Sequence, residues 1–320
     1  MFPGGWRFEL FVIGAAAVLC FCPSQATLIT FGSCNKLERL DSSALLFASI
    51  ASTKSDAFIW LGDSIYTDQK YAPYSFRAAD IESVRQQFKN WKESSANANL
   101  EASSNLLMGV WDDHDFGIND GGAEHAQKAA TQQIFLDFLG VPSDSPRRKR
   151  KGVYSSEVVG ESGQRVRIIL LDARFNRDSI GSNGDVLGAE QWLWLERELQ
   201  SDVKADMTII GSGIQVLNDW RPSENWGRFP SERARLLRLL SDSNATGVLF
   251  ISGDVHFAEL TEIKCDGEFK LIDFTSSGLS HCLDEEVHPF VRPLVQSPNP
   301  NPPPPSLPPG HALAFPSHAS

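Results

Sequence analysis

The sequence predicts an α/β protein, because short apolar runs alternate with stretches that have helical periodicity. Continuous apolar runs of this kind are typical of strands that are buried on both faces of a sheet. They lie at residues 57–66, 106–115, 165–175, 207–217 and 247–257, and polar or acidic clusters accompany them. Strands that alternate with helices along the chain indicate an α/β core.

Helical segments lie between these runs. Asp41 is expected to cap the first helix. A second helix is predicted at residues 134–139 and stops at Gly140, and two more are predicted at residues 188–200 and 231–240. Their apolar residues recur at the spacing of one helical face, so each helix is expected to pack with one side on the sheet. The first helix carries the apolar residues Leu45, Leu46 and Ile50.

Length and composition are those of a soluble globular protein. The chain has 320 residues, 42% of them hydrophobic and 22% charged, which is enough for a substantial core. Its net charge of −11 argues against general nucleic-acid or anionic-membrane binding, because both need a basic surface. An anionic substrate would therefore need local cations. The basic run 147–151 is expected to be a solvated loop, with substrate steering as the alternative.

Residues 1–26 are typical of a secretory signal peptide. Arg7 precedes the apolar run 10–21, and the small residues Ser24 and Ala26 suit cleavage after Ala26. A retained membrane anchor is the alternative, although twelve apolar residues are short for a bilayer span. We therefore expect the mature chain in the secretory pathway, outside the cell or in an endomembrane lumen, without a stable membrane span.

An oxidising compartment gives meaning to the remaining cysteines. Cys265 and Cys282 can form a disulfide that leaves Cys34 unpaired, although spacing alone cannot decide this pairing. Asn244 begins an N-glycosylation sequon that would be used if it is exposed. Residues 291–320 are rich in proline and are expected to form a disordered tail, with a linker or a ligand for a proline-binding module as the alternative.

Polar side chains follow the predicted strands at the ends where ligands collect in open α/β sheets. A lone aspartate in such a place is more often a helix cap or a turn former. Four strand ends that contain acids, two of which also carry a histidine, are hard to explain by capping. The side chains that bear chemistry are Cys34, Asn35, Asp63, Tyr66, Asp113, His114, Asp172, Arg174, Asp254 and His256.

These side chains form a mixed ligand set for metal ions. Carboxylates suit calcium, magnesium and manganese, whereas imidazole, thiolate and phenolate favour iron or zinc. Two metal ions that share a bridging aspartate fit this set better than one. Such a pair binds a phosphate ester and lowers the pKa of a bound water, which then attacks phosphorus in line.

The segments that carry these residues also show a family likeness. They are "FGSCN", "WLGDSIYTD", "WDDHDFGIND", "KGVYSSEVVG", "RVRIILLDARFNRD", "LGAEQWLWLERELQ", "GIQVLNDWRPSENWGRFPSERARLLRLL", "LFISGDVHFAEL" and "DFTSSGLSH". Together they resemble the PhoD-like (alkaline phosphatase D) branch of the metallophosphoesterase superfamily, to which calcineurin-like and purple acid phosphatases also belong. The resemblance spans residues 29–281. It implies a four-layered α/β/β/α sandwich with two mixed central sheets over residues 27–290, and a two-metal centre between the sheet edges.

The resemblance also implies roles for single residues. Asp63 would bridge the metal ions, His114 would face the substrate's phosphate or leaving oxygen, and Arg174 would contact the phosphate. For Arg174 a structural salt bridge is the alternative. The implied metals are Fe³⁺ and Ca²⁺, with Zn²⁺ or Mn²⁺ as the fallback. Their expected ligands are Cys34, Asp63, Tyr66, Asp113, Asp254 and His256.

Further polar residues are expected around these ligands. Asp115 is expected to fix the tautomer of His114, as carboxylates often do. Asn35 and Asp172 are expected to support the ligands or to contact the substrate. Two other aspartates are expected to be ordinary caps or turn residues: Asp112 and Asp120.

We therefore expect a secreted, metal-dependent enzyme that hydrolyses phosphomonoesters, phosphodiesters or both. Residues 211–219 lack a metal-binding histidine found in the wider superfamily, which favours the PhoD-like branch. From Val287 onward the chain departs from the family pattern. A catalytically silent binding protein with the same fold is therefore the main alternative, and a calcium-binding secretory protein is another.

Overall fold

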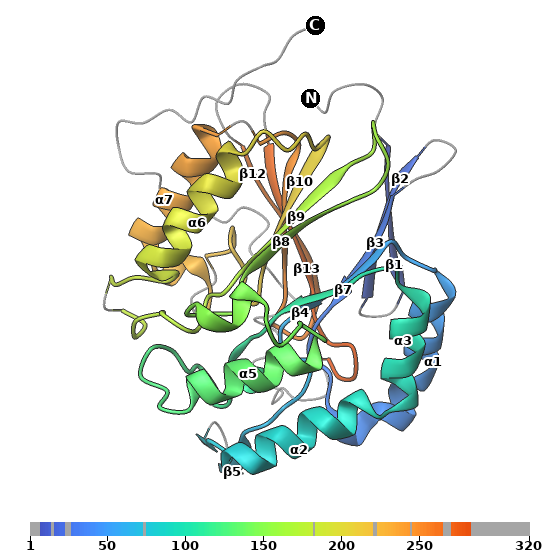
Figure 1. Ribbon diagram of the computed structural model, residues 1–320, viewed down its shortest axis with the longest axis vertical. Coiled ribbons are helices and arrows are strands. Elements are labelled where there is room, and N and C mark those ends of the chain that lie inside the picture. Colours follow the sequence, from blue (N-terminus) through green and yellow to red (C-terminus); the bar gives the residue numbers. More distant parts are fainter. Residues whose placement is uncertain are drawn as a thin grey trace, which may run out of the picture.

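A computed structural model gives the fold for most of the chain. It describes residues 7–13, 16–22, 27–72, 75–181, 183–219, 223–243, 245–264 and 270–282, with the backbone alone in the first two ranges. Two β-sheets face each other and carry helices on their outer sides (Figure 1). The predicted α/β class is therefore confirmed. Asn244, Cys265 and the proline-rich tail lie outside the described residues, so the sequon, the disulfide and the tail stay predictions.

The five-stranded sheet has the order β1-β2-β3-β4-β7. Strands β3, β4 and β7 are parallel, whereas β1 and β2 form an antiparallel hairpin that pairs with β3. This hairpin lies in the segment expected to be a signal peptide, whose cleavage stays a prediction. The strands are β1 (Arg7–Ile13), β2 (Ala16–Cys22), β3 (Leu28–Gly32), β4 (Ala57–Leu61) and β7 (Leu107–Val110).

The six-stranded sheet has the order β12-β13-β11-β10-β9-β8. Its four inner strands are parallel, and the outer strands β8 and β12 are antiparallel to their neighbours, so this sheet is also mixed. The strands are β8 (Ser155–Val159), β9 (Val166–Leu171), β10 (Met207–Ser212), β11 (Val248–Ser252), β12 (Ala258–Lys264) and β13 (Lys270–Ser276). A small separate hairpin consists of β5 (Gln69–Ala72) and β6 (Ser75–Arg77).

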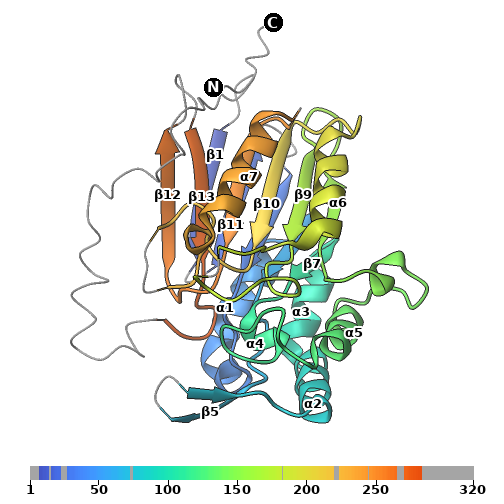
Figure 2. The same cartoon turned by 90° about the vertical axis from the view of Figure 1, so that its left-hand side faces the viewer.

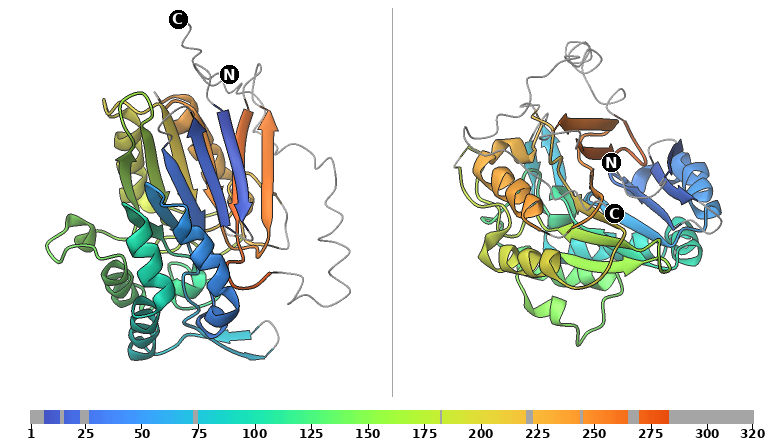
Figure 3. Two further views of the ribbon diagram at one scale, coloured as in Figure 1. Left: turned by 90° about the vertical axis from the view of Figure 1, so that its right-hand side faces the viewer. Right: turned by 90° about the horizontal axis from the view of Figure 1, so that it is seen from above.

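Helices cover the outer sides of both sheets. Helices α6 and α7 lie along the six-stranded sheet (Figure 2), and α1 and α3 lie along the five-stranded sheet (Figure 3). Within the described residues, every helix is too short or too polar to cross a membrane. The helices are α1 (Leu40–Ser52), α2 (Ile81–Lys92), α3 (Ser95–Ser103), α4 (Asp113–Phe116), α5 (Lys128–Phe138), α6 (Gly188–Gln200) and α7 (Pro230–Ser241).

The core consists of two apolar clusters. The larger one joins both sheets and includes Ile59 of β4 and Ile251 of β11. The smaller one lies between the six-stranded sheet and helices α6 and α7, and includes Trp192, Leu236 and Phe250. Because inner strands are covered on both faces, they carry the continuous apolar runs that identified them in the sequence.

The helix predictions were right in position but wrong in one detail. Arg39, rather than Asp41, is the N-cap of α1, and Asp41 lies in the first turn of that helix. Leu45 does not face the core, because its side chain is 86% exposed. Helices α2 and α3 were not predicted, since their sequences are mainly polar.

The basic run is not simply a solvated loop. Residues Pro146–Lys149 form a short 3₁₀ helix. Arg147 donates to the carbonyl of Val153, Arg148 to that of Pro142, and Arg150 to that of Tyr154. These arginines therefore fasten the loop to the fold.

Gly211 of β10 marks a close approach of the two sheets. A methyl group at this position would lie 2.6 Å from Leu170 Cδ2 and 3.0 Å from Leu61 Cδ2 of the facing sheet. Gly211→Val is expected to lower the free energy of unfolding by about 1–3 kcal/mol, because overpacking strains the core. Urea denaturation measures this loss. The control Leu260→Ala, on edge strand β12, should stay within about 0.5 kcal/mol of wild type, and equal losses in both variants would contradict the prediction.

Candidate metal centre

The predicted ligands lie where strand ends from both sheets meet. The carboxyl ends of the parallel neighbours β3, β4 and β7 lead to Cys34, Asp63 and Asp113. Strand β11 of the facing sheet leads to Asp254 and His256. The Cys34 thiol lies 3.7 Å from the carbonyl oxygen of Asp254, so the two sheets contribute to one site.

The backbone is left-handed at four of these positions. The φ angles are 63° at Cys34, 48° at Asp63, 77° at Asp254 and 60° at His256. Side chains other than glycine rarely adopt this conformation, which costs on the order of 1–3 kcal/mol per residue. Strained residues that coincide with donor side chains are typical of functional sites, because the surrounding fold must hold them in place.

The donor atoms form overlapping groups. One donor atom each from Cys34, Asp63 and His256 lie within 4.8 Å of one another, and the same holds for Asp63, Asp113 and His114. Asp63 therefore belongs to both groups, as a bridging ligand would. A third group joins Asp113 to Asp254 and Asp112.

Tyr66 lies beside the first group. Its Oη is 2.9 Å from His256 Nε2 and 3.2 Å from His281 Nε2. A phenol oxygen at hydrogen-bond distance from an imidazole nitrogen can become a metal ligand once both have lost their protons. The structure thus brings together all six predicted ligands.

Burial and mutual repulsion change the protonation of these groups. Desolvation and the charge of Asp113 raise the pKa of Asp63 well above its ordinary value of 3.8. Desolvation, followed by the charges of Asp112 and Asp113, does the same to the pKa of Asp254. Burial also opposes ionisation of the Cys34 thiol, but His256 outweighs it and lowers that pKa to about 6.

The donor set fits metal ions by its chemistry. Thiolate, imidazole and phenolate favour a borderline metal, whereas Asp113 and Asp254 add oxygen ligands for a hard cation. Asp112 Oδ2 is buried and has no hydrogen-bond partner in the described part of the chain. An unpartnered buried carboxylate oxygen among other acids costs free energy that a cation would recover.

His114 is held by a residue that the sequence interpretation did not identify. Its Nδ1 lies 2.6 Å from Asp68 Oδ1, and both side chains are largely buried. Burial lowers the pKa of His114, but Asp113 and Asp68 outweigh it, so this pKa lies above its ordinary value of 6.5. The hydrogen bond to Asp68 directs Nε2 of His114 away from the carboxylate.

Asp115 therefore does not have its expected role. Its Oδ1 accepts hydrogen bonds from the Ser64 hydroxyl and the Ile65 amide, and its Oδ2 accepts one from the Asp112 amide. The last contact belongs to a capping box at the start of α4, which turns Asp115 back towards the helix end. Asp115 supports the loop between β4 and Tyr66 instead of His114.

Asn35 and Asp172 lie near the site without reaching the donor groups. Asn35 donates to the Ser64 carbonyl at 3.0 Å, and its Oδ1 has no hydrogen-bond partner among the described residues. Asp172 accepts hydrogen bonds from the amides of Val153, Arg174 and Phe175. Both residues therefore organise the loops that carry functional side chains.

Arg174 is a structural residue in this arrangement. Its guanidinium is fully buried and lies 2.6 Å from Asp112 Oδ1 and 2.5 Å from Glu224 Oε2. Burial alone would lower the pKa of Arg174, but these two carboxylates raise it well above its ordinary value. The geometry thus favours the salt-bridge alternative over direct contact with a phosphate. It also corrects the interpretation of Asp112, which is an ion-pair partner as well as a helix cap.

Several functional positions were present in the family motifs but were assigned no role. Asp68 ends "WLGDSIYTD" and His281 ends "DFTSSGLSH". Glu224 is buried between Arg174 and Arg177, although its sequence context is a polar loop. A position within a matched motif was the available signal, and it did not say which partner each side chain would meet.

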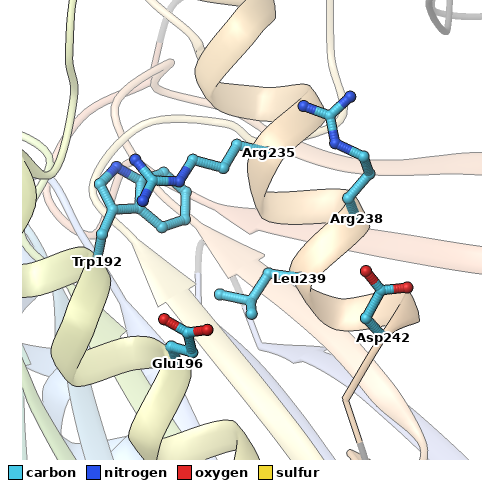
Figure 4. A pocket seen from close by; sticks show the side chains of 6 residues that line it. All are labelled: Trp192, Glu196, Arg235, Arg238, Leu239 and Asp242. Carbon is cyan, nitrogen blue, oxygen red and sulfur yellow. The ribbon is translucent and has the colours of Figure 1, made fainter.

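A separate groove lies between the outer helices α6 and α7, and it has a volume of about 220 Å³. Figure 4 shows its lining residues, with the guanidinium of Arg235 near the indole of Trp192. The distance from Arg235 Cζ to that ring centroid is 4.2 Å. The groove contains none of the predicted ligands, so it is not the metal centre. Its lining residues are Trp192, Glu196, Arg235, Arg238, Leu239 and Asp242.

The fold and the donor groups define the chain as a metallophosphoesterase. A family model described as "PhoD-like phosphatase" matches residues 29–286. The chain therefore belongs to the PhoD-like phosphatase family, as the resemblance predicted.

Individual relatives agree with this assignment. Alkaline phosphatase D of Bacillus subtilis (strain 168) is 23% identical over 284 residues, which cover 74% of this chain and 47% of that protein. The chain thus spans about half the length of this relative. A solved structure of PhoD has a TM-score of 0.61 and 19% identity, over 83% of this chain and 62% of that one. A dimetal phosphatase from Danio rerio has a TM-score of 0.47 and 15% identity, over 75% and 78% of the two chains.

Removing Arg174 should expose its structural role. Arg174→Met leaves the buried Asp112 and Glu224 without their counter-charge, so we expect a loss of about 3–5 kcal/mol in the free energy of unfolding. Arg235→Met, which removes an exposed arginine from the α6–α7 groove, should cost about 1 kcal/mol or less. Urea denaturation compares the two variants. Equal stability of Arg174→Met and wild type would show that the ion-pair network is dispensable.

The raised carboxyl pKa values predict an unusual pH dependence for the metal-free protein. Between about pH 4 and about pH 6, the folded chain keeps protons on Asp63 and Asp254 that the unfolded chain has lost, so the folded state binds more protons. Stability should therefore fall as pH rises through this window. Denaturation in a chelator measures the slope, and excess Zn²⁺ should reverse it because the cation binds the ionised carboxylates.

The matched control for this experiment is Asp63→Asn, which cannot hold the extra proton and should show a shallower slope. A stability that rises with pH in the chelated wild type would contradict the prediction.

Proposed function

We propose that the chain is a metal-dependent phosphoesterase that hydrolyses phosphomonoesters, phosphodiesters or both. The observation that carries this proposal is the sharing of Asp63 between a group with Cys34 and His256 and a group with Asp113 and His114. Two adjacent donor groups with one carboxylate in common suit a pair of metal ions. Such a pair activates water for attack on a phosphate ester.

Fe³⁺ and Ca²⁺ are the proposed metals, with Zn²⁺ or Mn²⁺ as the fallback. Cys34, Tyr66 and His256 supply the softer donors for the iron, and Asp113 and Asp254 supply oxygen for the calcium. Asp63 would contact both. The lowered pKa of Cys34, about 6, supports a thiolate ligand at neutral pH.

The protein's own groups would bind the ester and move a proton. His114 is poised by Asp68 to give a proton to the leaving oxygen or to stabilise charge on the phosphate. Lys36 Nζ lies 5.0 Å from the centre of the Tyr66 ring, so it places a cation beside the ligands. Since Arg174 is occupied by carboxylates, Lys36 is the better candidate for attracting an anionic substrate to a chain of net charge −11.

The catalytically silent alternative rests on the atypical sequence after Val287. The donor residues and His114 all precede residue 282, and they lie together in the described part of the chain. The site therefore does not depend on the atypical segment for its ligands, which favours an active enzyme.

The remaining features are proposals about organisation. Together with the helices on their outer sides, the two facing mixed sheets support the four-layered α/β/β/α sandwich implied by the family resemblance. Residues 1–26 would be removed as a signal peptide, the phosphoesterase domain would cover residues 27–290, and residues 291–320 would form a disordered tail. The mature chain would then lie in the secretory pathway or outside the cell, with Asn244 glycosylated and Cys265 joined to Cys282.

Hydrolysis assays test the proposed activity directly. Purified protein with its metals should hydrolyse an aryl phosphomonoester or phosphodiester, and His114→Ala should lower kcat/KM by about 10²–10⁴ because a proton donor is lost. Asp113→Asn, which removes a charged ligand, should lower both metal content and activity. His125→Ala is the matched control and should behave as wild type. Activity that survives both site substitutions would reject this site.

Asp68 should set the pH profile through His114. In Asp68→Asn the pKa of His114 falls, so His114 loses its proton at lower pH. We expect the alkaline limb of the kcat profile to move to lower pH and kcat to fall about 10–100-fold. Asp41→Asn, an exposed position in α1, is the matched control. An unmoved alkaline limb in Asp68→Asn would contradict the proposed proton donor.

A further inference from the structure

The segment that follows β13 crosses from the six-stranded sheet to the other half of the site. The amides of Gly278 and Leu279 donate to the Ser33 carbonyl at 3.2 and 3.0 Å, and the amide of Ser280 donates to the Cys34 carbonyl at 3.3 Å. These bonds fix residues 277–281 directly beside the loop that follows β3. The segment is therefore anchored independently of any side chain at its end.

Its first side chain already contacts two proposed ligands. Ser277 Oγ accepts a hydrogen bond from the His256 amide at 2.8 Å and lies 3.0 Å from Cys34 Sγ. A hydroxyl between these groups can donate to the thiolate while it accepts from the amide. The segment thus contacts ligands that come from both sheets.

His281 lies at the end of this segment and is 3% exposed. Its Nε2 is 3.2 Å from Tyr66 Oη, and its ring meets the Tyr66 ring edge-on with centroids 5.3 Å apart. On its other side, Nδ1 is 3.1 Å from Ser280 Oγ. Both ring nitrogens therefore have a defined partner.

The surroundings of Ser280 bear on the tautomer of His281. Ser280 Oγ accepts a hydrogen bond from the Lys36 amide at 2.7 Å, which leaves its hydroxyl proton for another acceptor. The nearer acceptor is His281 Nδ1 at 3.1 Å, and the Cys34 carbonyl is 3.4 Å away. When the hydroxyl donates to Nδ1, the imidazole carries its proton on Nε2 and directs it at Tyr66 Oη.

We propose that His281 is a positioning residue for Tyr66, and that it donates a hydrogen bond from Nε2 to the Tyr66 phenolate when that oxygen holds a metal ion. This inference rests on the proposed function. A metal-bound phenolate carries no proton, so the neutral imidazole must be the donor in this contact. Hydrogen bonds of this type orient a ligand and adjust its donor strength.

His281 acts through Tyr66 and does not itself complete the donor set. Within the described part of the chain, the clusters of ligand atoms include His256 with Cys34 and Asp63, but they do not include His281. The rings of His256 and His281 lie edge to face with centroids 4.3 Å apart, so the two histidines flank Tyr66 with different roles.

Three variants of the full chain separate the hydrogen bond from the shape of the side chain. His281→Phe keeps a ring and removes the donor, whereas His281→Gln keeps an N–H donor of similar reach. Ser280→Ala removes the partner of Nδ1. His125→Phe, a histidine outside the site, is the matched control. Circular dichroism and thermal melting of the metal-free proteins establish that each variant is folded.

Two readouts other than activity report on the ligand. Zn²⁺ affinity, measured by competition with a chromophoric chelator, should fall about 10–100-fold in His281→Phe. His281→Gln should recover most of this loss, Ser280→Ala should show a smaller one, and His125→Phe should match wild type. In protein loaded with Fe³⁺, the visible tyrosinate absorption of His281→Phe should move to longer wavelength, because the phenolate loses its hydrogen-bond donor.

The outcomes distinguish this inference from the proposed function. Wild-type protein that binds neither metal would overturn both. Wild-type protein that binds Zn²⁺ and hydrolyses phosphate esters, together with a folded His281→Phe variant of unchanged affinity and absorption, would overturn the role of His281 alone. Equal losses in His281→Phe and His281→Gln would also overturn it, because the hydrogen bond would not be the cause.

Discussion

Repulsion among buried carboxylates is the constraint on which the rest of this structure depends. Asp63, Asp112 and Asp113 are nearly inaccessible to water, and Asp254 lies beside them. A protein interior holds such charges only if they are paired, protonated or bound to a cation. The fold divides the task, because Arg174 neutralises one part of the cluster and the remaining carboxylates retain protons until a metal replaces them.

The same constraint explains why the ligands occupy a strained backbone. A strand that enters the site must stop abruptly and turn its next donor inwards, and a left-handed residue makes that turn within one position. Cys34, Asp63 and His256 each have this conformation. The cost is acceptable because two packed sheets hold the flanking residues, so the stability of the core maintains the geometry of the donors. Core and site are therefore coupled through the ends of the strands.

The strands and the ligands were predictable from the sequence because both are local signals. A continuous apolar run identifies a strand covered on two faces, and its last residues identify the edge where donors meet. The partners of those donors were not predictable. Asp115 was a reasonable partner for His114, but the capping box of α4 turns its side chain away and Asp68 makes the contact. Likewise, only the packing shows that Arg174 is buried between Asp112 and Glu224.

The link between the two ends of the described chain has a consequence for folding. Ser33 and Ser276 are hydrogen-bonded across 243 positions of sequence, and the neighbouring residues carry donors of the same site. Contacts this far apart form slowly, because a long loop must close before they contribute any stability. During synthesis, the first half of the chain therefore emerges with its acidic strand ends exposed, long before their partners exist. The metal centre is expected to be among the last parts of the native structure to assemble, so supply of metal before that stage would have no complete site to fill.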